Sequence, residues 1–193
     1  MKLLAFSDLH RDVEQARLLV ESARAADVVI AAGDFASIHK GLEETIEALR
    51  PIDKPTLLVP GNNETEDALR EACQGWGSAT VLHGEAAELD GVSFFGLGAG
   101  VPVTPWDWSF DLTDEEADAK LAGCPEGGVL ISHSPPKGYV DNDLGSGAVL
   151  EAIERARPQL VVCGHIHECW GQEATIGRTR VVNLGPEGAL LDV

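Results

Sequence analysis

Polar side chains that can bind metal ions follow five short apolar runs of the sequence, at 3–6, 28–32, 57–59, 129–131 and 160–163. The segments after these runs contain seven candidate ligands: Asp8, His10, Asp34, Asn62, His133, His165 and His167. Imidazole nitrogens together with carboxylate and amide oxygens suit divalent ions such as Mn, Fe, Ni, Zn or Mg. Seven ligands are too many for one ion, but they fit two ions that share a bridging carboxylate.

Two such ions would give the site the charge that an anionic substrate needs. Metal ions ~3.5 to 4 Å apart can hold the attacking and leaving oxygens of an in-line phosphoryl displacement. Their four positive charges, less those of Asp8 and Asp34, leave about two positive charges at the site. The whole chain has Lys+Arg 14 and Asp+Glu 32, a formal net charge of −18. We therefore expect a small phosphorylated substrate and not a long nucleic acid.

The apolar runs predict strands because they are short, and they do not alternate with polar residues, which indicates that both faces are covered. Helical spacing appears between the runs, with start or stop signals at Asp12, Pro51, Thr113 with Glu116, and Ser146. Alternation of strands and helices is typical of a mainly parallel sheet between helices. The carboxyl ends of parallel strands meet at one edge, so we expect the seven ligands to gather there.

Two stretches depart from this alternation. Residues 79–98 and 172–191 look like antiparallel strands, and His83 is expected on the surface at a strand end. The stretch 96–111 is rich in glycine and proline and is expected to be a long, functional loop. Within it, Trp106 and Trp108 either stack on a nucleobase or anchor their own loop.

Length and composition limit the classes of protein to which this chain can belong. The chain has 193 residues, 44% of them hydrophobic and 24% charged, which predicts one globular domain over 1–193. This composition excludes disordered, collagen-like and disulfide-built proteins. Neither a membrane-spanning run nor a signal-peptide core is expected, so we predict a cytoplasmic protein. The four cysteines form no Cys-x-x-Cys pair and are expected to be reduced core thiols.

The five polar segments together resemble the motifs of the calcineurin-like metallophosphoesterase superfamily, in its compact prokaryotic branch. They are Asp8-Leu9-His10, Gly33-Asp34, Gly61-Asn62-Asn63-Glu64, Ser132-His133 and Gly164-His165-Ile166-His167. The resemblance implies an α/β protein, a four-layer α/β/β/α sandwich of two mixed sheets flanked by helices. It also implies that Asp34 bridges two metals. The first metal would be held by Asp8, His10, Asp34 and His167, and the second by Asp34, Asn62, His133 and His165.

Two positions depart from the family pattern, and the first of them is Asn63. The family commonly has a histidine where this chain has Asn63, and that histidine is thought to stabilise the transition state or protonate the leaving oxygen. An asparagine donates a hydrogen bond but supplies no proton near neutral pH. Because general acid help is typically worth 10²- to 10⁴-fold, alkyl monoesters should suffer most. The resemblance also implies that other small members lack this histidine and still hydrolyse phosphodiesters.

Two further residues are candidates for compensating that change. Arg11 stands where the family usually has glycine, and its guanidinium either holds a substrate phosphate or pairs with Asp12 or faces water. His39 lies shortly after Asp34. It either reaches the site and replaces the missing histidine as general acid, or it is a solvated loop histidine.

The sequence thus predicts a binuclear phosphoester hydrolase in which a metal-bridging hydroxide attacks a small phosphodiester. Mn²⁺ is the favoured ion because the ligands mix nitrogen and oxygen. Asn62 and Asn63 would help to orient the phosphoryl group. The alternative is a catalytically weak or inactive scaffold with the same fold that binds a protein partner.

Overall fold

The computed structural model describes residues 1–193 and contains two mixed β-sheets. The first sheet has the strand order β11-β1-β2-β3-β4 and the second has the order β5-β6-β7-β8-β10-β9. The strands of the first are β1 (Lys2–Phe6), β2 (Val28–Ala31), β3 (Thr56–Leu58), β4 (Ala79–Val81) and β11 (Ala189–Asp192). Those of the second are β5 (Glu85–Leu89), β6 (Val92–Leu97), β7 (Val129–Ser132), β8 (Leu160–Cys163), β9 (Glu173–Ile176) and β10 (Thr179–Asn183).

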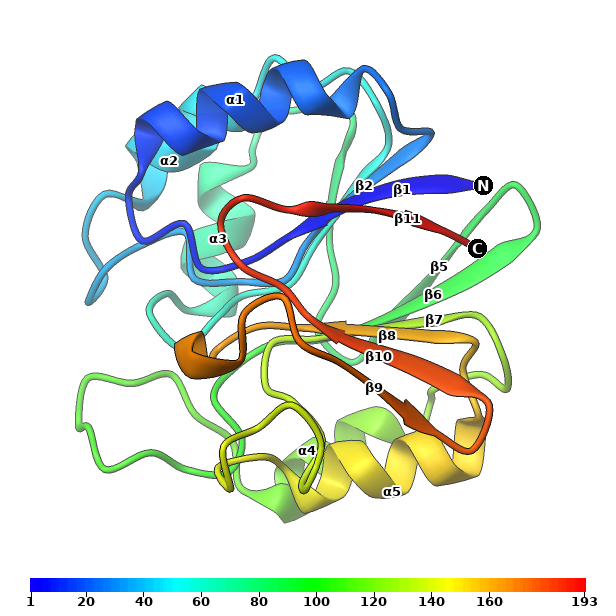
Figure 1. Cartoon of the computed structure of the whole chain (residues 1–193). Coiled ribbons are helices and arrows are strands. Elements are labelled where there is room, and N and C mark those ends of the chain that lie inside the picture. Colours follow the sequence, from blue (N-terminus) through cyan, green and yellow to red (C-terminus); the bar gives the residue numbers. More distant parts are fainter.

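Helices cover the outer face of each sheet, so the molecule has four layers (Figure 1). The first sheet is covered by α1 (Val13–Ala23), α2 (Leu42–Leu49) and α3 (Glu66–Ala72). The second is covered by α4 (Asp114–Leu121) and α5 (Gly147–Ala156). The expected four-layer sandwich of two mixed sheets is confirmed. A short 3₁₀ turn, η1 (His167–Cys169), follows β8.

Three apolar clusters fill the spaces between the four layers. In β1, Leu4 and Phe6 face the first helical layer, while Leu3 and Ala5 face the second sheet. Successive strand side chains point to opposite faces, so a strand buried on both sides has to be apolar throughout. The third cluster joins the second sheet to α4 and α5. The uninterrupted apolar runs of the sequence are thus explained by sheets that are covered on both faces.

The expected helix caps are present. The Asp12 carboxylate accepts a hydrogen bond of 2.9 Å from the Gln15 backbone N–H at the start of α1. Thr113 and Glu116 form a reciprocal capping box on α4, and Ser146 caps α5. These side chains satisfy backbone donors that a helix leaves free in its first turn. The sequence interpretation did not foresee α3, which is capped by Thr65.

The stretches expected to be antiparallel are only partly so. β5 pairs antiparallel with β6, β9 with β10, and β11 with β1. However, β4 is parallel to β3, β6 to β7, and β10 to β8. Helix α3 separates β3 from β4, and α4 separates β6 from β7, so the chain returns to start each second strand in the same direction.

His83 is buried, which corrects its expected place on the surface. Its side chain is 5% exposed, and its Nδ1 accepts a 3.0 Å hydrogen bond from the Gly98 backbone N–H. The ring also lies 5.7 Å from that of Phe110, centroid to centroid. The loop after β6 therefore covers a residue that the strand pattern alone leaves in solvent.

Two expectations about chain chemistry can be compared with the structure. All four cysteines are free, three of them buried and Cys124 half-buried. None of the helices combines the length and apolar character that a membrane crossing would require.

Candidate metal centre

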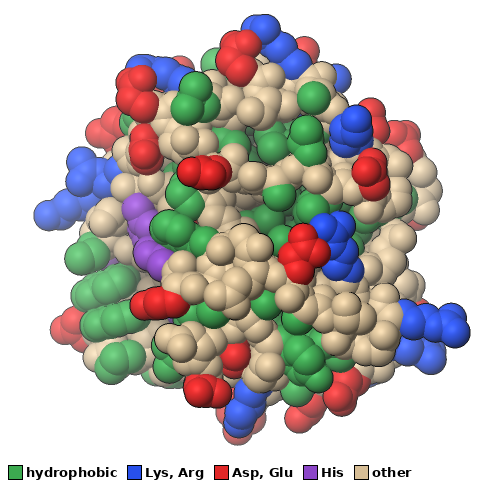
Figure 2. Space-filling model, viewed as in Figure 1, with side chains coloured by type: hydrophobic (Ala, Val, Ile, Leu, Met, Phe, Trp, Pro, Cys, Tyr) green, Lys and Arg blue, Asp and Glu red, His purple; other side chains and the backbone are tan.

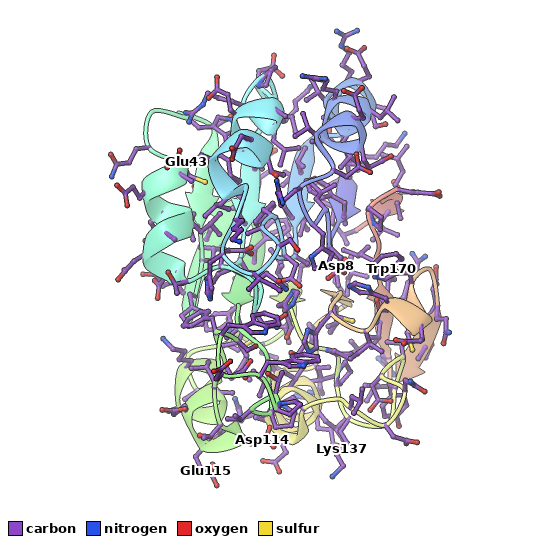
Figure 3. All side chains as sticks on the ribbon, turned by 90° about the vertical axis from the view of Figure 1, so that its left-hand side faces the viewer. Asp8, Glu43, Asp114, Glu115, Lys137 and Trp170 are labelled. Atoms are coloured by element: carbon purple, nitrogen blue, oxygen red, sulfur yellow. The ribbon has the colours of Figure 1, made fainter.

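The seven predicted ligands come together although they belong to two different sheets. Asp8 and His10 follow β1, Asp34 follows β2 and Asn62 follows β3, all in the first sheet. His133 follows β7, and His165 and His167 follow β8, in the second sheet. The expectation of one edge of one sheet is therefore replaced by facing edges of two sheets. Figure 3 shows Asp8 at the level where the two halves of the molecule meet.

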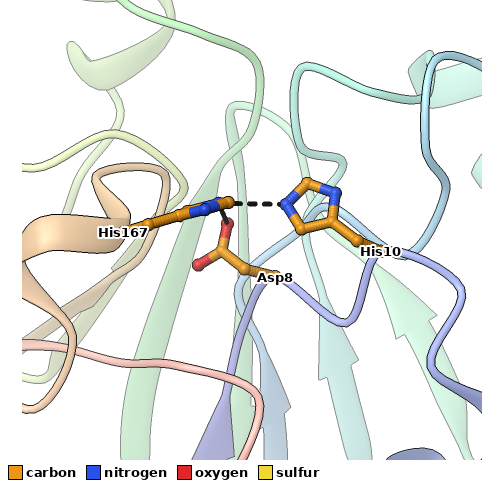
Figure 4. A group of neighbouring side chains, drawn as sticks. All are labelled: Asp8, His10 and His167. Atoms are coloured by element: carbon orange, nitrogen blue, oxygen red, sulfur yellow. Dashed lines mark hydrogen bonds and ion pairs between the residues drawn. The ribbon is translucent and has the colours of Figure 1, made fainter.

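Asp8, His10 and His167 form one group whose ligand atoms all lie within 4.8 Å of one another (Figure 4). The two Nε2 atoms of His10 and His167 are 3.0 Å apart, and His167 Nε2 is 3.9 Å from Asp8 Oδ1. Two ligands at ~2.1 Å from one ion, at right angles to each other, are ~3 Å apart. The donor set and its spacing therefore fit a single divalent ion.

Asp34, His133 and His165 form a second group with the same 4.8 Å limit. His133 Nδ1 lies 2.7 Å from the Ala32 carbonyl oxygen, to which it can donate, so its Nε2 is left facing the group. That Nε2 is 3.5 Å from Asp34 Oδ1 and 3.4 Å from Asn62 Oδ1. A hydrogen bond on one ring nitrogen selects the other as the ligand, which is the usual arrangement of metal-binding histidines.

The carboxylate of Asp34 lies between the two groups. Its Oδ1 faces His133 of the second group, and its Oδ2 is 3.6 Å from His10 Nε2 of the first. Burial, followed by the nearby negative charge of Asp8, raises the pKa of Asp34 well above its usual range. A cation beside both carboxylates would remove this electrostatic cost. The geometry and the charge of Asp34 both suit a bridging ligand.

Two histidines of the site, His165 and His10, have lowered pKa values, which favours the neutral form that binds metals. Burial, followed by the charges of His133 and His167, lowers the pKa of His165 to about 3. The pKa of His10 is also lowered, chiefly by burial. A neutral imidazole has a free lone pair at pH 7 and needs no deprotonation to coordinate.

The backbone of the site adopts conformations that side chains normally avoid. Four of the predicted ligands have positive φ angles: Asp8 at 56°, His10 at 44°, Asp34 at 60° and His165 at 68°. Such conformations cost roughly 1 to 3 kcal/mol each and cluster at functional sites. All four residues lie within four positions of the ends of β1, β2 and β8.

Two glycines leave the space that this packing needs. A Cβ atom at Gly61 would lie 2.0 Å from Asp34 Oδ1. A Cβ atom at Gly33, where φ is +93°, would lie 2.6 Å from His133 Nδ1. Each glycine of the two motifs therefore permits a predicted ligand to approach the neighbouring backbone.

Glu64 fastens the loops of two strands together, a role that the sequence interpretation missed. Its buried carboxylate accepts hydrogen bonds from the backbone N–H groups of Asp34 at 2.8 Å, Ala36 at 2.9 Å and Gly61 at 2.7 Å. Burial, followed by the charge of Asp34, raises the pKa of Glu64 to about 7. The motif spacing placed Glu64 beside the site but did not indicate that it binds the loop of Asp34.

Asn63, one of the two positions that depart from the family pattern, contacts the bridging candidate. Its side-chain amide donates to Asp34 Oδ2 at 2.7 Å, and its backbone N–H donates to Asp34 Oδ1 at 2.9 Å. Its Oδ1 accepts a hydrogen bond of 2.8 Å from the Ile38 N–H. The Asn63 amide therefore holds Asp34, and Asn63 also lines the cavity described below, where the sequence interpretation expects it to help orient the phosphoryl group.

The other two candidate catalytic residues lie outside the cavity. The exposed Arg11 packs its side chain over Gly41, at the start of α2. The exposed His39 places its Nε2 2.5 Å from the Trp108 carbonyl oxygen. Neither residue is among those that line the cavity described next.

A cavity of about 620 Å³ opens over the two groups. Five predicted ligands line it: His10, Asp34, Asn62, His165 and His167. Trp106 and Trp108 line it from the loop after β6, and Glu168 lines it beside His167. No lysine or arginine is among its lining residues. Its size is in the range of sites for small molecules, ~300 to 1,000 Å³.

Comparison with known proteins identifies the family. The profile described as "Calcineurin-like phosphoesterase superfamily domain" matches residues 1–191. The chain belongs to the calcineurin-like phosphoesterase superfamily. It is 28% identical over 207 residues to UPF0046 protein K07C11.7 of Caenorhabditis elegans, an alignment covering 95% of this chain and 69% of that protein. It is 38% identical over 95 residues to human metallophosphoesterase domain-containing protein 1, covering 44% of this chain and 29% of that protein.

Solved structures confirm the calcineurin-like phosphoesterase fold. Protein TT1561 of Thermus thermophilus has a TM-score of 0.81 at 19% identity, covering 99% of this chain and 93% of that one. A dimetal phosphatase of Danio rerio has a TM-score of 0.67 at 15% identity, covering 96% and 88%. Family membership and the two side-chain groups together point to divalent metal ions.

Proposed function

We propose that this calcineurin-like phosphoesterase is a binuclear metal phosphodiesterase that acts on a small phosphodiester. The observation that carries the proposal is the position of Asp34, whose two oxygens face histidines of two separate ligand groups. We assign Asp8, His10, Asp34 and His167 to one ion, and Asp34, Asn62, His133 and His165 to the other. When bound, two such ions lower the pKa of a coordinated water and neutralise charge on the phosphoryl oxygens.

The side chains of the cavity favour a diester over a monoester. A monoester carries up to two negative charges near neutral pH and a diester carries one. Since no lysine or arginine lines the cavity, nothing but the metals would balance the second charge. Glu168 adds a negative charge at the wall. The buried Asn63 supplies no proton for an alkoxide leaving group.

Hydrogen bonds from neighbouring residues hold the predicted metal ligands in place. The Asn63 amide holds Asp34, and the Glu64 carboxylate holds the backbone of the Asp34 loop. The carbonyl oxygens of Ala36 and Ala32 bind the Nδ1 atoms of His10 and His133 and direct their Nε2 atoms inward. These contacts fix the ligands before the substrate arrives, which reduces reorganisation during the reaction. Mn²⁺ is the ion we favour for this mixed set of donors.

A panel of metals and substrates tests the proposal. Bis(p-nitrophenyl) phosphate and p-nitrophenyl phosphate are offered with Mn²⁺, Fe²⁺, Ni²⁺, Mg²⁺ or Zn²⁺. We expect Mn²⁺ to support faster cleavage of the diester than of the monoester. Asp34→Asn should reduce kcat/KM by more than the ~100-fold typical of changes beside metal ligands. Asp53→Asn, the same change at an exposed residue, is the matched control and should have no effect.

The alternative is a scaffold that keeps the fold and binds a protein partner. A protein that binds two ions but cleaves neither ester with any of the five metals would contradict the phosphodiesterase and support the scaffold.

A further inference from the structure

Three exposed apolar side chains gather at the cavity of the candidate metal centre. Val103, Trp106 and Leu144 are 57%, 50% and 59% exposed, and all three line this cavity. They are three of the seven large hydrophobic residues that the whole molecule exposes. On the face drawn in Figure 2, hydrophobic side chains (green) lie next to exposed histidine side chains (purple). Apolar surface that is left exposed beside polar binding groups is typical of a ligand site.

The loop that carries Trp106 is fastened to a predicted metal ligand. Asn62 Nδ2 donates to Ser109 Oγ at 2.8 Å, and Ser109 Oγ donates to Asp111 Oδ1 at 2.6 Å. Asp111 Oδ2 accepts from the Thr104 backbone N–H at 2.8 Å and from its hydroxyl at 2.7 Å. The Asn62 carbonyl also accepts from the Phe110 N–H at 2.9 Å. This chain of bonds fixes the distance between the loop and the site.

Trp106 is supported on one side by another ring. The rings of Trp106 and Trp108 stack with centroids 5.5 Å apart and an angle of 12° between their planes. The His39 ring contacts Trp108 edge-on at 6.5 Å and bonds its carbonyl oxygen. Trp108 is therefore the residue that anchors the loop, while half of the Trp106 side chain stays exposed. A ring held in this way can accept a second ring by stacking at little entropic cost.

The charged side chains that line the cavity determine which substituents on the substrate phosphate can bind there. The cavity has no lysine or arginine to receive a second phosphate or a carboxylate, and Glu168 would repel either. Beyond the phosphoryl group, the apolar and aromatic side chains of the loop offer contact that needs no charge on the substituent. Every planar aromatic ring offers a face for such stacking, whether it is an aryl group or a nucleobase.

We propose that Trp106, with Val103 and Leu144, binds a planar aromatic substituent of the phosphodiester. This inference rests on the proposed function because it concerns the substrate of the same cavity. The substrate class is then an aryl or nucleoside phosphodiester. The residue that determines this preference is Trp106.

Direct binding measurements test the inference without requiring turnover. Phenyl phosphate, adenosine 5′-monophosphate and methyl phosphate are titrated calorimetrically into the Mn²⁺-loaded protein. We expect the wild type to bind both aromatic ligands more tightly than methyl phosphate. Trp106→Ala should weaken the aromatic ligands by roughly 5- to 150-fold and leave methyl phosphate unchanged. Trp106→Phe, which keeps a ring, should restore part of this loss.

The controls separate stacking from other causes. Leu144→Ala should weaken aromatic ligands in the same sense, whereas Leu18→Ala, at an exposed residue outside the cavity, should not. If Trp106→Ala weakens the binding of both phenyl phosphate and adenosine 5′-monophosphate, the surface stacks on aromatic rings in general. If Trp106→Ala weakens the binding of adenosine 5′-monophosphate alone, the surface is specific for a nucleobase.

Two results would overturn the inference. One is equal affinity of the wild type for phenyl, adenosine and methyl phosphates. The other is a Trp106→Ala variant that weakens all three equally, which would make Trp106 a second loop anchor. Turnover of bis(p-nitrophenyl) phosphate by the wild type is measured in parallel. An inert wild type that still prefers aromatic ligands would refute the phosphodiesterase alone, and an active one without that preference would refute the aromatic surface alone.

Discussion

The indole N–H of Trp170 donates a hydrogen bond of 3.2 Å to Asp8 Oδ2. The same indole lies against the ring of His167, with centroids 4.3 Å apart. Figure 3 shows Trp170 next to Asp8. One side chain outside the predicted ligand set therefore contacts two members of the first group. Gly185 lies under the indole, where a Cβ atom would be 3.0 Å from Trp170 Cγ.

We expect Trp170→Phe to weaken the first metal site selectively. The phenyl ring keeps contact with His167 but cannot donate to Asp8, so the carboxylate is held less firmly. Changes to such supporting residues typically cost ~10- to 100-fold in metal affinity. Calorimetric titration with Mn²⁺ should show one site weakened by that factor and the other unchanged.

Trp76→Phe is the matched control for this prediction. Its indole also loses a hydrogen bond, to the Ile52 carbonyl oxygen at 3.0 Å, but it lies in the apolar cluster under the first helical layer. It should affect stability and leave both Mn²⁺ affinities intact. Wild-type affinity at both sites in Trp170→Phe would refute the supporting role.

Gly61→Ala should disrupt the bridging position directly. The new methyl group would sit 2.0 Å from Asp34 Oδ1, and the backbone N–H of Asp34 would be 2.3 Å away, so the carboxylate must move. We expect both metal sites to lose affinity together because Asp34 serves both. Gly77→Ala meets nothing within 4 Å and is the control for the same substitution. Binding of two Mn²⁺ ions by Gly61→Ala with unchanged affinity would argue against Asp34 as the shared ligand.

The buried His83 makes stability depend on pH. Burial, followed by the charge of Lys120, lowers the pKa of His83 to about 4. An unfolded chain, with a histidine pKa near 6.5, binds a proton between pH 6.5 and 4 that the folded protein does not. The contribution of His83 to the free energy of unfolding should therefore be greatest above pH 6.5 and fall by at most roughly 3 kcal/mol as the pH drops to 4.

His83→Asn isolates this contribution. The asparagine side-chain oxygen can still accept the hydrogen bond from Gly98 but cannot take a proton. Urea unfolding of both proteins at several pH values should give curves whose difference changes between pH 6.5 and 4 and is constant above pH 7. A constant difference over the whole range would show that His83 titrates alike in both states.

The sequence predicted which side chains come together, because that prediction depends on local features. Each ligand directly follows an apolar strand, and parallel strands bring their carboxyl ends together whatever the rest of the chain does. The caps of α1, α4 and α5 were also predictable, because capping depends on residues three positions apart.

What the sequence did not predict depends on contacts between distant segments. Trp170 reaches Asp8 across 162 residues, because the turn η1 reverses the chain after β8. His83 is buried by the loop after β6, and Arg11 turns toward Gly41 and away from the cavity. Hydrophobic periodicity assigns a residue to a face of its own element, but it does not reveal which other element covers that face.

Anomalous diffraction from a crystal grown with Mn²⁺ would show whether Asp34 joins two divalent ions. We predict two manganese peaks ~3.5 to 4 Å apart on opposite sides of the Asp34 carboxylate. One peak should contact His10 and His167, and the other His133 and His165. A single peak, or two peaks that do not share Asp34, would contradict the bridging role on which the proposed activity depends.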